Sequence, residues 1–312
     1  MRAFLFPGQG SQSVGMGKAL ADASAAARDV FGEVDEALGQ NLFRLMSDGP
    51  DEELKLTENA QPAIMAHALA VYRVLTREGG LDLEKAAHFV AGHSLGEYSA
   101  LAAAGSFGMA TTAKLLKLRG QAMQRAVPVG EGAMAALLGA DVDLAQRIAS
   151  TAAEGEVCEV ANDNDPSQVV ISGHKGAIDR AIELAKEMGA KRAIALPVSA
   201  PFHCTLMQPA ADAMAEALAK VTLAAPVVPL YANVTAAATA NPDEIRDQLV
   251  QQVTGMVRWR ESIANMAAEG VSEFVELGGK VLGPMVKRIA PDAKVTSVVS
   301  IEDVEAIAKE LA

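Results

Sequence analysis

The chain has 312 residues, half of them hydrophobic, and a formal net charge of −12 at neutral pH. Its length allows one large domain or two smaller ones, its charge argues against a nucleic-acid partner, and no apolar run reaches the ~20 residues of a membrane helix. Two cysteines, Cys158 and Cys204, are too few for a disulfide framework and form no metal-type pair, and no export signal is recognisable, so we expect a cytoplasmic globular protein without a metal.

The N-terminal segment combines a short strand with a glycine-rich loop. Residues 3–6 are apolar, and the loop Pro7-Gly8-Gln9-Gly10-Ser11-Gln12 follows them, ahead of an alanine-rich helix near residues 16–27. A dinucleotide-binding turn does not fit, because Ser13 stands where the third glycine belongs. Loops at the carboxyl ends of parallel strands share one crevice, so we expect a backbone N–H near Gln9 to reach the same pocket as Ser94.

A helix is expected to begin at Pro62 and to run to about Thr76, because proline is favoured in the first helical turn. Apolar residues within it are spaced for one buried face. His67 lies in this helix. A lone helical histidine is more often a core or surface residue than a catalyst, so we give it no catalytic role.

The stretch from Phe89 to Tyr98 predicts a strand, a sharp turn and a helix around the pentapeptide Gly92-His93-Ser94-Leu95-Gly96. A side chain at Gly92 or Gly96 would crowd such a turn, and the strain lifts the Ser94 hydroxyl clear of its own backbone. The helix that starts near Leu95 adds free N–H groups where an oxyanion would form beside the serine. Ser94 is therefore the candidate nucleophile.

Arg119 lies in the middle of the apolar face of a helix expected from Thr111 to about Ala126. A guanidinium keeps its proton, and burying it without an anion costs several kcal/mol, so the helix implies a carboxylate or phosphate opposite Arg119. That anion is either an internal Asp or Glu or part of the substrate. The position of Arg119 soon after the serine turn favours the substrate.

Residues 132–198 predict the order β-α-β-β-α-β, with strands at 133–138, 157–161, 168–172 and 192–198 and helices at 141–153 and 176–188. This order is the ferredoxin-like unit, which indicates a small domain inserted into a larger one. Residues 162–167, with the sequence Asn-Asp-Asn-Asp-Pro-Ser, are expected to form its hairpin loop rather than a calcium site. His174, after the third strand, is expected to be exposed.

His203 follows the insert, in a loop between a strand and an alanine-rich helix. A general base for Ser94 would be held at such a place, where the chain returns to the crevice of the large domain. His93 is the rival, but its side chain should point to the opposite side of the chain from Ser94. His88 lies too far back, at the start of the serine strand.

Strands and helices alternate in the rest of the chain, with strands near 271–277 and 294–299 and a last helix capped by Ser300 and Asp303. The fold class is therefore α/β. We expect a parallel-sheet, α/β-hydrolase-like large domain of residues 1–127 and 199–312, with an inserted ferredoxin-like βαββαβ small domain of residues 128–198.

With these motifs assembled, the chain closely resembles the malonyl-CoA:acyl carrier protein transacylases of bacterial fatty acid synthesis along almost its whole length. The resemblance is carried by motifs in a fixed order: Pro7-Gly8-Gln9-Gly10-Ser11-Gln12, Asn59-Ala60-Gln61-Pro62-Ala63, Gly92-His93-Ser94-Leu95-Gly96-Glu97, Arg119-Gly120 with Met123, Pro201-Phe202-His203 and Val257-Arg258-Trp259.

The resemblance implies a role for each matching residue. Ser94 would be the nucleophile and His203 its base, and the backbone amides of Gln9 and Leu95 would receive the oxyanion. Arg119 would bind the malonyl carboxylate. Further implied residues are Gln61 and Phe202, which would contact substrate, and Gln252, whose main-chain carbonyl would orient His203 in place of an aspartate.

The implied reaction is a ping-pong transfer of malonyl from malonyl-CoA to the phosphopantetheine thiol of acyl carrier protein, with no cofactor or metal. A monomer is expected. We also expect a cationic rim to receive the acidic carrier, formed by Lys191, Arg192, Lys280, Lys287 and Arg288. Two rivals stay open: a serine hydrolase or thioesterase, which shares the serine turn, and a non-catalytic subunit that binds acyl carriers.

Overall fold

The computed structural model describes residues 1–311 and contains two sheets. The larger sheet has six strands in the order β10-β9-β1-β2-β7-β8, of which the first five are parallel and β8 is an antiparallel edge strand. Its strands are β1 (Arg2–Phe6), β2 (Phe89–Gly92), β7 (Leu230–Ala232), β8 (Ala237–Thr239), β9 (Glu273–Leu277) and β10 (Lys294–Val298). The parallel α/β prediction is confirmed, and the antiparallel edge is an addition to it.

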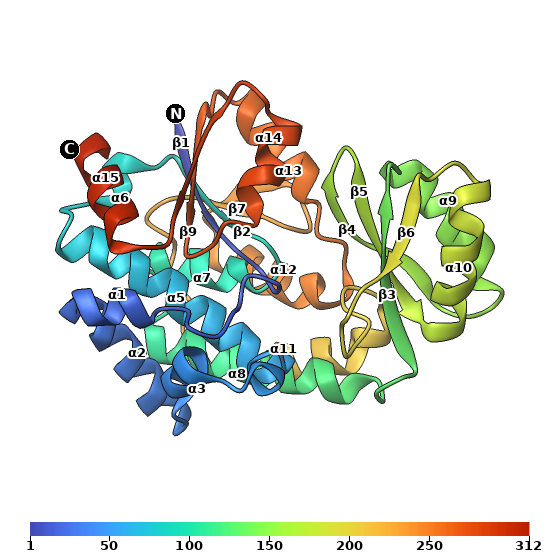
Figure 1. Cartoon of the computed structure of the whole chain (residues 1–312), viewed down its shortest axis with the longest axis horizontal. Helices are drawn as coiled ribbons and strands as arrows, with labels where there is room; N and C mark the ends of the chain where they lie inside the picture. Colours follow the sequence, from blue (N-terminus) through green and yellow to red (C-terminus); the bar gives the residue numbers. More distant parts are fainter. Residues whose placement is uncertain (312) are drawn as a thin grey trace.

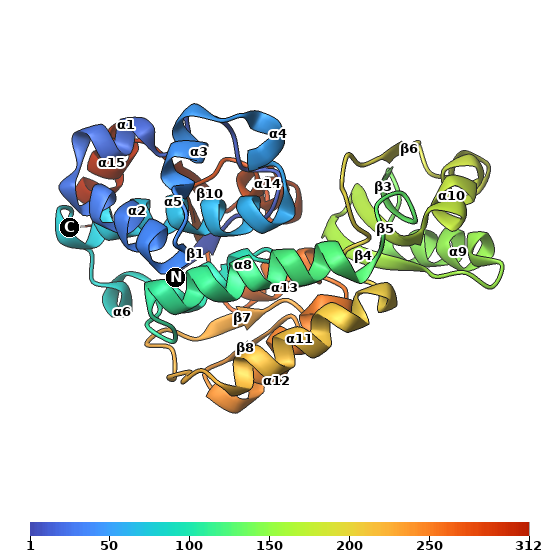
Figure 2. The ribbon, with the colours of Figure 1, turned by 90° about the horizontal axis from the view of Figure 1, so that it is seen from below.

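Helices cover both faces of this sheet, as Figures 1 and 2 show. Successive side chains of a strand point to opposite faces of the sheet, and in β1 both sets are apolar. Phe4 and Phe6 belong to one core cluster, whereas Ala3 and Leu5 belong to another, so both faces need a cover of helices. The first face carries α2 (Ala25–Leu38), α5 (Thr57–Arg77), α7 (Gly96–Ala103), α8 (Met109–Ala126), α11 (Gln208–Ala219) and α12 (Pro242–Thr254). The second carries α13 (Trp259–Ala268) and α14 (Leu282–Ile289).

Shorter elements complete the large part of the molecule. They are α1 (Lys18–Ala23), α3 (Leu42–Asp48), α4 (Asp51–Leu54), α6 (Leu83–Ala86), the 3-10 helix η1 (Thr205–Met207) and α15 (Ile301–Leu311). The predicted cap of the last helix is confirmed, since the Asp303 N–H donates to Ser300 Oγ at 3.2 Å and the Ser300 N–H donates to the Asp303 carboxylate at 3.1 Å. None of the helices in residues 1–311 has the length and hydropathy needed to span a membrane.

The second sheet stands at one end of the molecule, on the right of Figure 1. It is antiparallel throughout, in the order β4-β5-β3-β6, and has its own core cluster with two helices. Its elements are β3 (Gly132–Leu138), α9 (Val142–Ala153), β4 (Cys158–Asp165), β5 (Gln168–His174), α10 (Lys175–Glu187) and β6 (Arg192–Ala195). The predicted βαββαβ order is confirmed.

The predicted hairpin loop at residues 162–167 is wrong in most of its length. Strand β4 continues to Asp165, and these side chains are buried. Burial is possible because Asp163 pairs with Arg260 of α13 and Asp165 pairs with Arg288 of α14, each at 2.8 Å. Local turn propensity is thus overridden by ion pairs with the large sheet's helices.

Four further predictions need correction. Helix α5 begins at Thr57, so Pro62 lies inside it; close packing of this buried helix outweighs the missing proline N–H. The helix expected at 16–27 is two helices, because Ser24 ends α1 and its side chain caps α2.

Strand β6 ends at Ala195 rather than at residue 198. His174 is only partly exposed, and its Nδ1 accepts from the Val157 N–H at 2.9 Å.

Candidate active site

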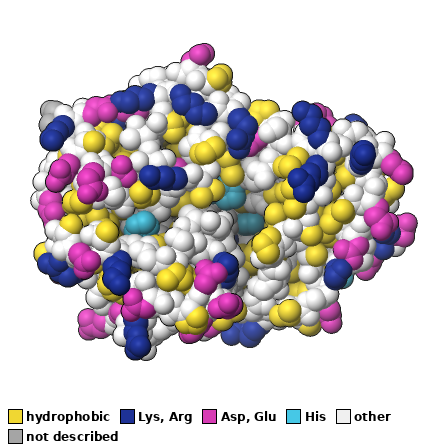
Figure 3. Space-filling view, viewed as in Figure 1, with side chains coloured by type: hydrophobic (Ala, Val, Ile, Leu, Met, Phe, Trp, Pro, Cys, Tyr) yellow, Lys and Arg dark blue, Asp and Glu magenta, His cyan; other side chains and the backbone are white. Residues whose placement is uncertain are grey.

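A cavity of about 410 Å³ lies between the two sheets and contains the predicted site residues. Figure 3 shows the molecule hollowed at its centre, with histidine side chains visible in the hollow. The large sheet contributes loops that follow β1 and β2, and the small sheet contributes residues of β3, β4 and β5. The site therefore lies where the carboxyl ends of parallel strands face the inserted unit.

The turn after β2 has the strained geometry that the pentapeptide predicts. Ser94 has a φ of 53°, which non-glycine residues rarely adopt. A Cβ atom on Gly92 would lie 1.9 Å from the carbonyl carbon of Gly96, and one on Gly96 would lie 2.2 Å from the Phe6 carbonyl oxygen. Both glycines are therefore required for the chain to pass through this turn.

Asn233, which follows β7, stabilises the turn from the neighbouring strand. Its Oδ1 accepts from the Ser94 N–H at 2.8 Å, and its Nδ2 donates to the Gly92 carbonyl at 2.7 Å. The side chain is fully buried, so these bonds replace water at the turn. We did not predict this role from the sequence, where Asn233 is one polar residue after an apolar run.

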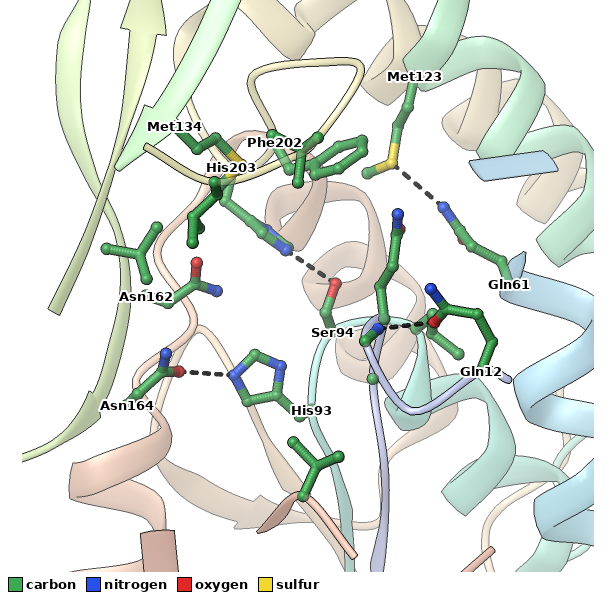
Figure 4. A pocket seen from close by; sticks show the side chains of 18 of the residues that line it. Gln12, Gln61, His93, Ser94, Met123, Met134, Asn162, Asn164, Phe202 and His203 are labelled. Atoms are coloured by element: carbon green, nitrogen blue, oxygen red, sulfur yellow. Dashed lines mark hydrogen bonds between the residues drawn. The ribbon is translucent and has the colours of Figure 1, made fainter. Parts of the chain in front are cut away.

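His203 contacts Ser94, as the sequence predicts. Its Nε2 lies 2.8 Å from Ser94 Oγ (Figure 4), and its Nδ1 lies 2.8 Å from the Gln252 main-chain carbonyl. Because a carbonyl only accepts, Nδ1 carries the hydrogen and Nε2 is free to accept from the serine hydroxyl. Burial, with the Arg119 charge nearby, lowers the pKa of His203 to about 3, so the ring is neutral near pH 7.

His93, the rival base, points elsewhere. Its Nε2 lies 2.8 Å from Asn164 Oδ1, and its ring packs against Trp259 with centroids 5.5 Å apart. Figure 4 shows it on the opposite side of the turn from the Ser94–His203 pair. It lines the cavity without contacting the serine hydroxyl, which leaves His203 as the histidine in position to accept the serine proton.

Two backbone N–H groups beside Ser94 remain available for an anion. Gln9 and Leu95 line the cavity, and neither N–H donates to an acceptor within the described chain. Leu95 precedes the first residue of α7, so its N–H also lies at the positive end of that helix. This is the arrangement expected of two oxyanion donors.

Arg119 reaches the same hydroxyl from α8. Its Nη2 donates to Ser94 Oγ at 3.2 Å and to Gln252 Oε1 at 2.8 Å, and its Nη1 donates to Gln61 Oε1 at 2.8 Å. It is 1% exposed and its Nε has no partner. Side-chain amides, rather than a carboxylate, contact the guanidinium, since Arg119 forms no ion pair with Asp or Glu of residues 1–311. This geometry favours the substrate as its anion.

Other side chains shape the cavity around these groups. Phe202 and Met123 border it beside Gln61, whose Nε2 contacts the Met123 sulfur at 3.6 Å. Asn162 and Asn164 enter it from β4, so the segment wrongly expected to be a loop forms part of its wall. No group of three metal-type ligands occurs anywhere in the part of the chain that the structure describes.

The side chain of Gln252 was missed by sequence reasoning, which assigned only its carbonyl. Besides accepting from Arg119, it donates through Nε2 to the Ser94 carbonyl at 3.0 Å. One glutamine thus contacts the serine, the histidine and the arginine. A single sequence gives no signal for this role, because residue 252 lies near the end of a helix with ordinary composition.

Comparison with known proteins places this serine, histidine and arginine arrangement in a class. Residues 3–283 match the model of the acyl transferase domain family. A malonyl CoA-acyl carrier protein transacylase of Escherichia coli strain K12 is 49% identical over 92% of each chain. The chain therefore belongs to the malonyl CoA-acyl carrier protein transacylase family.

Solved structures agree with that assignment. An acyl-carrier-protein S-malonyltransferase from Bartonella henselae is 52% identical, with a TM-score of 0.97 and 99% of each chain covered. A malonyl-transacylase solved in complex with a type II polyketide acyl carrier protein is 39% identical, with a TM-score of 0.95 over 99% of each chain. The similarity covers both sheets, so the inserted unit belongs to the shared fold.

Proposed function

We propose that this enzyme transfers a malonyl group from malonyl-CoA to the phosphopantetheine thiol of an acyl carrier protein, through a covalent acyl-serine, in fatty acid biosynthesis. The observation that carries the proposal is the position of the Ser94 hydroxyl between His203 and Arg119. Ser94 Oγ lies 2.8 Å from a neutral imidazole nitrogen and 3.2 Å from a buried guanidinium nitrogen. The names of the relatives support the same substrate pair.

In the first half of the reaction, His203 Nε2 takes the Ser94 proton while Oγ attacks the thioester carbonyl. The carbonyl oxygen becomes an oxyanion, which accepts hydrogen bonds from the N–H groups of Gln9 and Leu95. Collapse of the tetrahedral intermediate breaks the carbon–sulfur bond, and the imidazolium returns its proton to the coenzyme A thiolate. The Gln252 carbonyl holds the ring by Nδ1 throughout.

In the second half, the carrier's thiol replaces coenzyme A and the steps run in reverse. His203 accepts the thiol proton, the sulfur attacks the acyl-serine, and the proton passes to Ser94 Oγ as the ester bond breaks. Coenzyme A and phosphopantetheine are therefore substrates, and the chemistry uses no cofactor. The same base serves both halves, because each half exchanges one alcohol proton for one thiol proton.

Arg119 is proposed to select the diacid. A malonyl carboxylate would accept from the free Nε and from Nη2, which points toward the serine. Charged hydrogen bonds in a buried site are worth ~1.5–3 kcal/mol each, so two of them favour malonyl over acetyl by at least ~100-fold. Gln61 holds the other end of the guanidinium, and Phe202 closes the cavity beside it.

The rival hydrolase shares this geometry and differs in the acceptor that it admits. Mass spectrometry of the enzyme after exposure to malonyl-CoA tests the proposal. We expect one malonyl group on Ser94, stable until a carrier thiol removes it, and none on Ser94→Ala. Release of free malonate without transfer would indicate a hydrolase. Absence of acylation would indicate a non-catalytic carrier-binding subunit.

A cationic rim for the acidic carrier stays a prediction, and the structure narrows its candidates. Figure 3 shows Lys and Arg side chains on both sides of the hollow. Arg288 already pairs with buried Asp165, and Lys287 donates to the Ala293 carbonyl at 2.6 Å. The rim is therefore proposed to depend mainly on Lys191, Arg192 and Lys280. Charge reversal there should slow carrier acylation but leave Ser94 acylation unchanged.

The cytoplasmic location and the monomeric state are also proposals that come from the sequence. Fractionation of the cells that make the protein would test the first, and the mass of the purified protein in solution would test the second.

A further inference from the structure

A buried carboxylate lies behind the site and takes no part in the acyl-transfer steps. Glu97 is the second residue of α7 and is 1% exposed. Its Oε2 accepts from Gln252 Nε2, whereas Oε1 has no hydrogen-bond partner. Burying a carboxylate with one oxygen unsatisfied is costly, so an acidic residue at this position requires an explanation.

The contact with Gln252 supplies that explanation. A glutamine amide can be placed in two orientations that differ by exchange of its oxygen and nitrogen. The correct one directs Oε1 to Arg119 and Nε2 to the Ser94 carbonyl. In the other, an NH₂ group would face the guanidinium, donor against donor. Glu97 Oε2 and the Ser94 carbonyl both accept from Gln252 Nε2, so together they hold the nitrogen on this side.

We propose that Glu97 is a positioning residue for acyl transfer, which fixes the Gln252 amide between Ser94 and Arg119 and acts as the counter-charge of Arg119 until a substrate carboxylate takes its place. The inference rests on the proposed function, because it assigns the substrate carboxylate to Arg119. It extends that function to a residue that contacts no substrate.

The charges around Glu97 support the second part of this role. Burial raises the pKa of Glu97 to about 7, and Arg119 on α8 is the cation that opposes this rise. The buried histidines on the neighbouring segments stay neutral near pH 7. Burial lowers the pKa of His67 on α5, of His93 after β2 and of His203.

Tyr98, next to Glu97 on α7, has a pKa raised far above neutrality by burial and is also uncharged. Glu97 is therefore the group beside Arg119 whose charge changes near neutral pH.

Malonyl binding should consequently be linked to a proton. The substrate carboxylate adds a negative charge at Arg119, which disfavours ionised Glu97 and raises its pKa further. Above pH 7 the enzyme then has to take up a proton as malonyl binds, so the KM for malonyl-CoA rises with pH. A shift of one pKa unit corresponds to about tenfold in KM. Acetyl-CoA brings no carboxylate, and its KM should stay flat.

Two substitutions separate positioning from charge. Glu97→Leu removes one of the acceptors that hold the Gln252 amide in place and should lower kcat for malonyl transfer ~100-fold. Glu97→Gln keeps an oxygen that can accept from Gln252 and should recover most of that loss. It should also abolish the rise in malonyl KM between pH 6 and 8. Glu273→Gln, at the opposite end of the parallel sheet, replaces a partly buried glutamate, serves as the control and should change neither.

The native enzyme is first shown to acylate Ser94, since failure there would remove the proposed function and not only this inference. Rates are then expressed per folded molecule, counted by tryptophan fluorescence of the buried Trp259. Equal kcat in Glu97→Leu and the native enzyme would overturn the positioning role. A pH-dependent malonyl KM that persists in Glu97→Gln would overturn the counter-charge.

Discussion

The two halves of the active site are built by different means. Ser94 and His203 both have positive φ values, 53° and 56°, so this serine–histidine pair is held by strained backbone. Arg119 lies in a regular helix and is held by the side-chain amides of Gln61 and Gln252. On the proposed function, the backbone half performs a reaction common to all acyl groups, and the side-chain half selects the acyl group.

The largest effect should come from removing the base. His203→Ala is expected to lower the rate of Ser94 acylation by ~10⁴-fold with both malonyl-CoA and acetyl-CoA, because the proton transfer is common to both. His93→Ala should cost less than ~10-fold, since His93 bonds to Asn164 and not to the serine. Acylation rates measured by mass spectrometry distinguish the two histidines. A change in the malonyl-to-acetyl ratio in His203→Ala would contradict the assignment of acyl selection to Arg119 and its amide partners alone.

The strained turn itself can be tested through stability. A methyl group at Gly92 would meet the Gly96 main chain at 1.9 Å, and backbone cannot move aside cheaply. Gly92→Ala should therefore lose about 4 kcal/mol of unfolding free energy or fail to fold. Gly32→Ala, in the middle of α2 with no atom within 4 Å of the added methyl, should gain up to about 1 kcal/mol.

Urea titrations would measure both glycine variants. Equal stability of Gly92→Ala and the native protein would show that the turn is not the strained element inferred here.

The side-chain half should respond differently. Arg119→Ala is expected to reduce the preference for malonyl over acetyl ~100-fold, mainly through slower malonyl transfer. Arg119→Lys should recover only part of this preference, because an ammonium lacks the planar pair of donors. Competition between the two thioesters in one reaction measures the ratio directly. Arg180→Ala, in α10 of the small sheet, serves as the control, and an unchanged ratio in Arg119→Ala would exclude Arg119 from the acyl site.

The sequence predicts the backbone half well because its causes are local. The glycine spacing around Ser94 is a steric requirement of a single turn. The order of strands and helices in residues 132–198 follows from hydrophobic periodicity within each segment. His203 was identified because a strand-to-helix loop after the insert returns to the same crevice. Each of these signals is contained in a few neighbouring residues.

The rest of the site depends on contacts between distant segments, which no local pattern encodes. Asn233 and the Gln252 side chain are ordinary polar residues until folding brings them to the serine turn. Asp163 and Asp165 look like turn formers, yet Arg260 and Arg288 hold them in a buried strand. Pro62 likewise lies inside α5, where burial of the helix stabilises it despite the proline. Tertiary contacts outweigh propensity in each case.

A final prediction compares how His203 and Glu97 make the free energy of unfolding depend on pH. His203 is buried neutral, with a pKa of about 3 against about 6.5 in an unfolded chain. Below pH 6.5 the unfolded state binds a proton that the folded state refuses, so stability falls as pH falls, by about 2 kcal/mol between pH 6.5 and 5. Glu97 has the opposite sign: its folded pKa of about 7 exceeds the unfolded value, so it favours folding as pH falls toward 5.

Urea titrations of His203→Gln and Glu97→Gln at pH 7 and 5 test this pair of signs. Other buried histidines, such as His67 and His93, also destabilise the native protein in acid, but they are present in both variants and cancel in the comparison. Relative to the native protein, His203→Gln should lose less stability on acidification and Glu97→Gln should lose more. Slopes of the same sign would mean that one of these groups is not buried in the charge state assigned to it, and the electrostatic contrast between the two halves would fail.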